Sequence, residues 1–138
     1  MIQILQITVW SVALANARLV CVFGNPTVAE EYRLRTVFVG TVVSERYEPP
    51  TKHFDQEGTT YTVRVDELIR GQLPRTIRIF SENSSGRWPM QVGTKYLLFV
   101  YRDSGRFIVD YCGNSEVYSA SSPQLREVRR LKAADKRN

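Results

Sequence analysis

The sequence predicts an all-β domain with peripheral helices, built as a five-stranded antiparallel barrel. Five segments of alternating or continuous apolar residues are separated by loops rich in Gly, Pro, Ser and Asn, which is the pattern of short strands and turns. Helix-start signals occur only before the first strand and after the last. The 138 residues, 43% of them hydrophobic, suit one domain that buries its own core.

The first predicted strand, residues 36–47, is apolar on both faces, with the sequence TVFVGTVVSERY. Such a pattern is typical of a strand in a small closed barrel whose outer face a helix covers. Gly40 in the middle predicts a bend or a bulge. KYLLFVYR is the most continuously apolar of the later segments, and the DSG turn after it predicts a hairpin with the last strand. The other four strands are predicted at residues 59–71, 75–81, 95–102 and 106–112.

A short helix is predicted before the first strand. Thr27 followed by Glu30 three positions later forms a capping box, the signature of a helix N-terminus, and the helix runs over about residues 27–34. Glu30 and Glu31 suit the first turn of that helix because carboxylates there are favoured by the helix dipole.

A basic C-terminal helix or tail is predicted over residues 121–138. Ser122 before Pro123 is a helix-start signal, and an apolar stripe at three-residue steps would dock on the barrel. Of the formal net charge of +5, residues 126–138 carry +4, so the body of the protein is nearly neutral. The alternative is a helix that binds a membrane surface or an anionic partner. The stripe consists of Leu125, Val128 and Leu131.

The first seventeen residues predict an export signal. They are uncharged, mostly apolar and end on Ala-Asn-Ala, the small-x-small pattern of a signal-peptide cleavage site, although no basic residue precedes Arg18. The stretch is too short and too polar for a membrane span. We therefore expect a signal peptide at 1–17, a barrel domain at 18–120 and a mature protein that is periplasmic or secreted. A buried N-terminal strand or an uncleaved anchor are the alternatives.

The chain contains two cysteines, Cys21 and Cys112. In an exported protein an even number of cysteines predicts a disulfide, here one that closes a loop of about 90 residues. Two buried free thiols are the alternative. A metal site is disfavoured, because the only histidine, His53, lies in a polar loop and no paired ligand spacing is present.

Catalytic chemistry is not apparent in the sequence. The chain has no Gly-x-Ser-x-Gly motif and no phosphate-binding glycine loop, and His53 lacks a residue that would orient it as a base. We therefore expect no catalytic residues, no metal and no cofactor.

The aromatic residues raise two further possibilities. Aromatic side chains on the last two predicted strands could stack bases, as in single-stranded nucleic-acid-binding barrels, but the neutral body disfavours nucleic acid and favours a core role. Trp88 lies beside Arg87 in the polar SSGRWPM loop, and tryptophan and arginine are enriched at protein interfaces. Arg87 and Trp88 are thus candidate partner-binding residues, with Trp88 as a lid over the barrel end as the alternative. The strand aromatics are Tyr96, Phe99, Tyr101, Phe107 and Tyr111.

Four blocks of the sequence, VFVGTVVS, YTVRVDELIRGQ, VGTKYLLFV and DYCGNS, resemble a known family. The family comprises small exported bacterial proteins with the fold of the tissue inhibitors of metalloproteinases, a netrin-module type of OB-fold barrel. The resemblance covers about residues 19–118. It implies a Cys-x-Cys element near the mature N-terminus, in which Cys21 matches the second cysteine and Cys112 its partner on the last strand.

The chain departs from that family pattern at one bridge. Leu19 occupies the place of the first cysteine, and the place of its partner falls near Ser85, so both halves of the bridge are missing. In the animal inhibitors, the amino group and carbonyl of an N-terminal cysteine chelate the protease zinc. Cleavage after Ala17 would begin this chain at Arg18, without a terminal cysteine. The resemblance therefore supports the family's fold for this chain more strongly than it supports the family's inhibition of metalloproteases.

We therefore expect an exported, non-enzymatic binding module whose contact surface combines the Cys21 segment and the SSGRWPM loop. Its partner would be an unidentified protein or ligand. Inhibition of a metalloprotease through the segment near Cys21 is the first alternative, and a single-stranded nucleic-acid-binding OB domain is the second.

Overall fold

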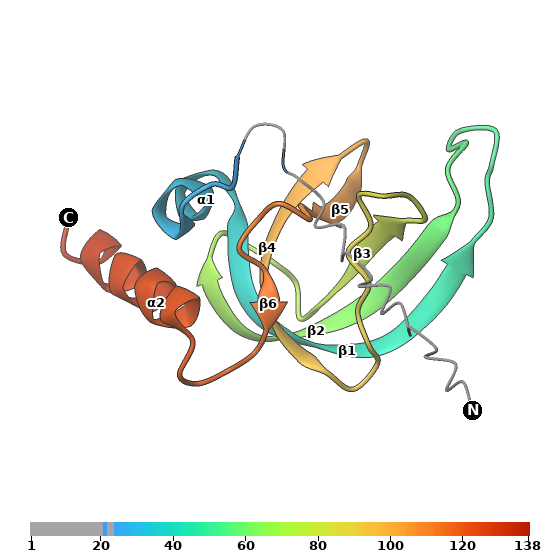
Figure 1. Ribbon diagram of the computed structural model, residues 1–138. Coiled ribbons are helices and arrows are strands. Elements are labelled where there is room, and N and C mark those ends of the chain that lie inside the picture. Colours follow the sequence, from blue (N-terminus) through green and yellow to red (C-terminus); the bar gives the residue numbers. More distant parts are fainter. Residues whose placement is uncertain (1–20, 22–23) are drawn as a thin grey trace, which may run out of the picture.

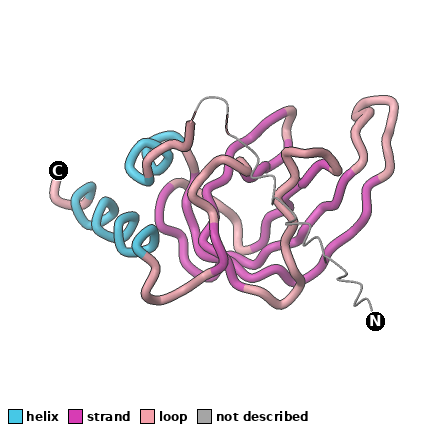
Figure 2. The backbone as a smooth tube through the Cα atoms, viewed as in Figure 1, coloured by secondary structure: helices cyan, strands magenta, loops and turns pink. Residues whose placement is uncertain are grey.

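The computed structural model describes residues 21 and 24–138, which form a mostly β structure with two helices (Figure 1). The predicted signal peptide lies outside the described residues. The helices lie together on one side of the strands, and the long β1–β2 hairpin extends on the other (Figure 2). The elements are α1 (Val28–Leu34), β1 (Thr36–Glu48), β2 (Gly58–Arg70), β3 (Thr76–Glu82), β4 (Lys95–Asp103), β5 (Arg106–Val109), β6 (Glu116–Val117) and α2 (Pro123–Asp135).

Five strands close into a hydrogen-bonded ring in the order β1-β2-β3-β5-β4, with β4 paired back to β1. The short β6 was not predicted, and it pairs with β4 beside the ring. The prediction of a wholly antiparallel sheet is wrong, because β3 and β5 are parallel where Ile79 faces Phe107. Strand directions cannot alternate all the way around a closed ring with an odd number of strands. A ring of five must therefore contain at least one parallel neighbour pair.

The first four strands lie within one residue of their predicted ends, because their apolar patterns, alternating or continuous, reflect burial directly. The fifth strand is shorter than predicted and ends at Val109 rather than at residue 112. Asp110 begins a turn there: its Oδ1 accepts a hydrogen bond from the Cys112 N–H at 2.8 Å, and its carbonyl accepts one from the Gly113 N–H. Such Asx turns compete with strand pairing.

β1 separates two hydrophobic cores, as its two apolar faces predicted. Phe38 and Val42 point into the ring, whereas Val37 and Val39 pack beneath the helices. The predicted irregularity at Gly40 is confirmed by a shift in the β1–β2 register between Val39 and Gly40. A β-carbon at Gly40 would lie 2.7 Å from side-chain atoms of Phe38 and Val63, so only glycine fits.

Both predicted helix starts are confirmed. Thr27 and Glu30 form the reciprocal capping box of α1, and the Ser122 side chain accepts from the Leu125 N–H at the start of α2. The predicted docking stripe of α2 is confirmed as well, with Leu125 and Val128 buried and Leu131 partly buried.

Polar contacts hold α2 in place. The Tyr32 hydroxyl of α1 donates to Asp135 at 2.7 Å, and the Lys132 ammonium donates to the Leu68 carbonyl of β2 at 2.8 Å. Burial, together with the bond to Asp135, raises the pKa of Tyr32 to about 12, so the hydroxyl remains a donor.

Candidate functional site

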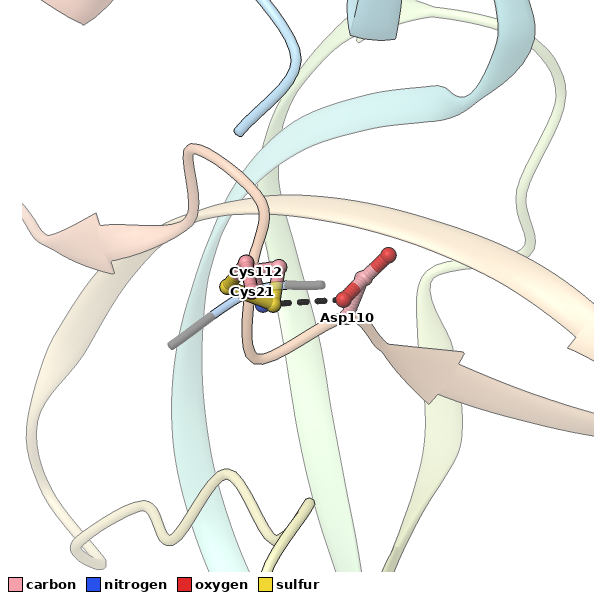
Figure 3. The surroundings of a disulfide bond; sticks show 3 residues. All are labelled: Cys21, Asp110 and Cys112. Atoms are coloured by element: carbon pink, nitrogen blue, oxygen red, sulfur yellow. Dashed lines mark hydrogen bonds between the residues drawn. A yellow bond between two sulfur atoms is a disulfide. The ribbon is translucent and has the colours of Figure 1, made fainter. Parts of the chain in front are cut away.

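A disulfide between Cys21 and Cys112 ties the start of the described chain to the turn after β5 (Figure 3). The two Cα atoms are 5.9 Å apart, although the residues are separated by 91 positions in the sequence. The predicted pairing is confirmed, and neither cysteine remains as a free thiol. A structural disulfide is consistent with an oxidising compartment.

Residues 110–115, here named the disulfide turn, are also held by a buried carboxylate from α1. Glu31 is only 3% exposed, and its Oε2 accepts hydrogen bonds from the backbone N–H of Asn114 at 2.7 Å and from the Asn114 side-chain amide at 2.8 Å. The same amide donates to the Pro26 carbonyl. Burial raises the pKa of Glu31, and the two bonds from Asn114 oppose that rise. The segment after Cys21 is thus fastened twice, covalently at Cys112 and by hydrogen bonds at Asn114.

Gly113 allows this close approach. A β-carbon there would collide with the Glu31 carboxylate. A buried carboxylate needs donors that reach it directly, and the bare backbone at Gly113 leaves room for it beside the Asn114 donors.

Residues 83–94 connect β3 to β4 and are here named the Trp88 loop. Trp88 is partly buried and packs on the core inside the ring, with its indole edge-to-face on Tyr96 at a centroid distance of 5.4 Å. Its backbone N–H donates to the Ser81 hydroxyl at 3.0 Å. These contacts match the lid interpretation, and they fix the indole in one orientation.

Arg87, the neighbour of Trp88, is exposed. Its guanidinium donates to the Asn83 side chain at 3.3 Å within the loop. The two candidate partner-binding residues are thus adjacent in sequence but differ in environment, because Trp88 packs inward and Arg87 faces solvent.

The Trp88 loop and the disulfide turn meet where the backbone at Gly86 lies against the Tyr111 ring. A methyl group on Gly86 would come within 3.2 Å of the Tyr111 ring, so the two segments lie against each other. Tyr111 itself is 43% exposed. The structure therefore brings together the two segments that the sequence suggested for a contact surface, the Cys21 attachment and the SSGRWPM stretch.

A pocket of about 240 Å³ opens beside this contact. Its walls come from the β1–β2 loop, β3, the Trp88 loop, the end of β4 with the turn after it, and β5 with the residue pair that follows it. It lies next to the parallel β3–β5 contact, which consists of a single residue pair, so the ring has few hydrogen bonds there.

Both aromatic rings and charged groups line the pocket. The Arg106 guanidinium lies between two rings, with its carbon 3.6 Å from the Phe54 centroid and 4.2 Å from the Phe80 centroid. Another arginine, Arg35, lies 4.2 Å over the Tyr101 ring. Burial raises the pKa of Tyr101, as do the nearby carboxylates of Asp110, Asp103 and Glu82, while Arg35 lowers it.

The remaining predicted residues lie elsewhere. His53 is exposed in the β1–β2 loop. Tyr96 and Phe99 are buried in the two cores, so neither ring is available to stack a base. Across residues 21 and 24–138, no cluster of three or more metal-binding side chains occurs. No helix in the same part of the chain is long and apolar enough to cross a membrane.

Sequence reasoning missed Asn114 and Arg106, and it assigned Glu31 only to the helix dipole. Asn114 lies 83 positions from Glu31, and no local sequence pattern predicts a contact between residues so far apart in the sequence. Arg106 carried a weaker signal, since it follows the DSG turn and begins a predicted strand. A cation at that place could face either solvent or the ring.

Comparison with protein-family models gives no match for this sequence, and neither does comparison with curated proteins.

Proposed function

We propose that the protein is an exported, non-enzymatic binding module of the family that resembles the tissue inhibitors of metalloproteinases, with an OB-type barrel. A closed five-strand ring whose outer face carries helices supports this proposal, because OB folds are five-stranded Greek-key barrels. The single retained bridge between Cys21 and Cys112 agrees with the cysteine pattern that the resemblance implies.

The binding surface in this proposal consists of the disulfide turn, the Trp88 loop and the pocket between them. The observation that carries it is the contact of Gly86 with the exposed Tyr111 ring beside Cys112. Two segments that are separately fastened, one by a disulfide and one by the packing of Trp88, meet there and present tyrosine, tryptophan and arginine side chains. Rigid surfaces rich in these residues bind proteins well because little conformational entropy is lost on association.

Site-specific photo-crosslinking of the full chain in the producing organism tests this surface. A benzoylphenylalanine residue would replace Arg87 or Tyr111, both of which are exposed, and Arg130 on α2 would serve as the control position. We expect the same higher-mass adduct from positions 87 and 111 and none from position 130. Adducts of equal yield at all three positions, or none at any, would contradict the proposal.

Inhibition of a metalloprotease through the segment near Cys21 is the second candidate. It draws support from the bridge that holds Cys21 in one place, because zinc chelation by a terminal amine requires such rigidity. Sequencing of the native N-terminus separates the two candidates. A chain that begins at Cys21 would favour chelation, whereas a chain that begins at Arg18 would favour the binding module.

A further inference from the structure

The pocket beside the Trp88 loop has an excess of negative charge. Three carboxylates line it, those of Glu82, Asp103 and Asp110, against one lining cation, Arg106. Within residues 21 and 24–138, none of these carboxylates forms an ion pair. Among the described residues, the Glu82 carboxylate accepts from the Ser84 hydroxyl alone and the Asp110 carboxylate from the Cys112 N–H, so oxygen lone pairs remain for a further donor.

The same pocket offers aromatic faces. Phe54 and Phe80 already hold the Arg106 guanidinium between them, which shows that this wall attracts a planar cation. Trp88, Tyr101 and Tyr111 line the remaining space. Aromatic rings combined with carboxylates form the environment in which guanidinium groups bind best, through stacking and charge-assisted hydrogen bonds.

The size of the pocket limits what can enter. Its volume of about 240 Å³ is smaller than the roughly 300–1,000 Å³ of pockets that hold cofactors and drug-sized ligands. A single long side chain fits a space of this size better than a nucleotide or a sugar does.

We propose that this pocket binds an arginine side chain presented by a protein partner, with Glu82 and Asp110 as the carboxylates that receive it. The proposal rests on the binding function proposed above and specifies its partner chemistry. Arginine is favoured over lysine because its guanidinium is planar, stacks on aromatic rings and donates to two carboxylate oxygens at once. An anionic group would have only Arg106 to bind, and it would face three carboxylates.

Tryptophan fluorescence provides the measurement. The chain has two tryptophans, Trp10 and Trp88, so the full chain carrying Trp10→Phe reports on Trp88 alone, whether or not the leader is removed. The probe is the blocked peptide acetyl-Gly-Gly-Arg-Gly-Gly-amide. Matched peptides carry lysine, citrulline or glutamate in place of arginine, citrulline being the uncharged shape analogue.

We expect a saturable change in Trp88 emission with the arginine peptide, weaker binding of the lysine peptide, and no binding of the citrulline or glutamate peptides. The double variant Glu82→Gln, Asp110→Asn should weaken binding of the arginine peptide about tenfold or more. Both replacements keep an oxygen that can accept the existing hydrogen bonds from Ser84 and Cys112, so the fold should be retained. Glu45→Gln with Glu127→Gln is the control, because it changes the net charge equally at two positions that do not line the pocket, the exposed Glu45 and the half-buried Glu127, and it should leave binding unchanged.

Three results would overturn the proposal: no saturable change with the arginine peptide, equal binding of the citrulline peptide, or equal weakening by the control variant. Failure of this pocket is distinguishable from failure of the whole surface. Crosslinks at positions 87 and 111 could persist in the Glu82→Gln, Asp110→Asn variant while the wild-type protein does not bind the arginine peptide. That result would support the proposed binding surface and would contradict the assignment of an arginine side chain to the pocket.

Discussion

Glu31 is the one buried charged residue in the described part of the chain, and the donors to its carboxylate come from a turn 83 positions away. Removal of the carboxylate in Glu31→Ala would leave the Asn114 donors unpaired in a partly buried site. We expect this variant to lower the free energy of unfolding by about 1–3 kcal/mol, measured by urea denaturation. Stability equal to that of the wild type would show that the Glu31–Asn114 contact does not hold the turn.

The raised pKa of Glu31 also predicts a pH dependence. Because the folded state binds the Glu31 proton more tightly than the unfolded state does, Glu31 contributes more stability below its ordinary pKa of 4.5, and that contribution is lost as the pH rises through the higher folded pKa. Glu31→Gln does not titrate. The stability of this variant relative to wild type should therefore increase between about pH 4 and about pH 7.

Glu127→Gln provides the control for this pH dependence, because the hydrogen bond from Arg130 lowers the pKa of Glu127. The wild type should therefore gain stability relative to Glu127→Gln as the pH rises, in the opposite direction. A difference between Glu31→Gln and wild type that does not vary with pH would contradict the assignment of the raised pKa.

Trp88 and Arg87 are neighbours with different environments, one partly buried and the other exposed. Trp88→Ala removes an indole that packs on Tyr96 and the ring core, and we expect a loss of about 1–3 kcal/mol in the free energy of unfolding. Arg87→Ala should change that free energy by less than about 0.5 kcal/mol, because the side chain is exposed. Equal losses in the two variants would mean that the loop is not anchored by Trp88.

At the scale of the elements, the disulfide fixes the N-terminal segment to the turn after β5. A bridge across 91 positions stabilises the fold by roughly 4–5 kcal/mol in the chain-entropy treatment, and native bridges commonly contribute about 2–5 kcal/mol. The double variant Cys21→Ser, Cys112→Ser should lose stability in that range in urea denaturation. A reduced wild-type protein should behave like this variant, and a difference between them would point to a role of the thiols beyond the bridge.

The bend of β1 at Gly40 is a second feature at this scale. Gly40→Ala would force its methyl group against Phe38, Val63 and the Arg64 carbonyl, so we expect a loss of about 1–3 kcal/mol. Ser44→Ala, at an exposed position of the same strand, is the control and should be nearly neutral. If Gly40→Ala were equally neutral, the crowding at the bend would be relieved by movement of β1.

The elements that the sequence predicted well are those whose signal is local. The apolar patterns of β1 to β4 indicate which side chains are buried, and Thr27 with Glu30 indicates a helix start, so both were predictable from neighbouring residues alone. The end of β5 depends on a single Asp110 turn that overrides an apolar pattern continuing through Tyr111. The parallel β3–β5 contact has no local signal; a closed five-strand ring requires at least one parallel pair but does not determine which strands form it.

The candidate site was predictable in part. The pairing of Cys21 with Cys112 followed from there being only two cysteines, and Trp88 drew attention as an aromatic residue in a polar loop. The contact of Gly86 with Tyr111 and the pocket beside it arise where segments distant in sequence meet, and they depend on how the ring closes. No sequence pattern within the Trp88 loop or within the disulfide turn predicts that the two segments meet.

Considered as a whole, the molecule has two regions, the helices and the surface formed by the disulfide turn and the Trp88 loop, and the Glu31–Asn114 contact joins them. The helices pack on one side of the ring (Figure 1), and residues 126–138, in α2 and after it, carry +4 of the net charge of +5. The disulfide turn and the Trp88 loop contribute to the walls of a pocket that three carboxylates line. In our proposal export, oxidation of the two cysteines and formation of the binding surface are linked, because the bridge orders the turn that contacts the loop.

Peptide mapping of the native protein by mass spectrometry, under conditions that preserve disulfides, tests this link most directly. We predict a mature chain that begins at Arg18, with the peptides of Cys21 and Cys112 joined by a disulfide. Recovery of both cysteines as free thiols, or of an intact chain that still begins at Met1, would contradict the account.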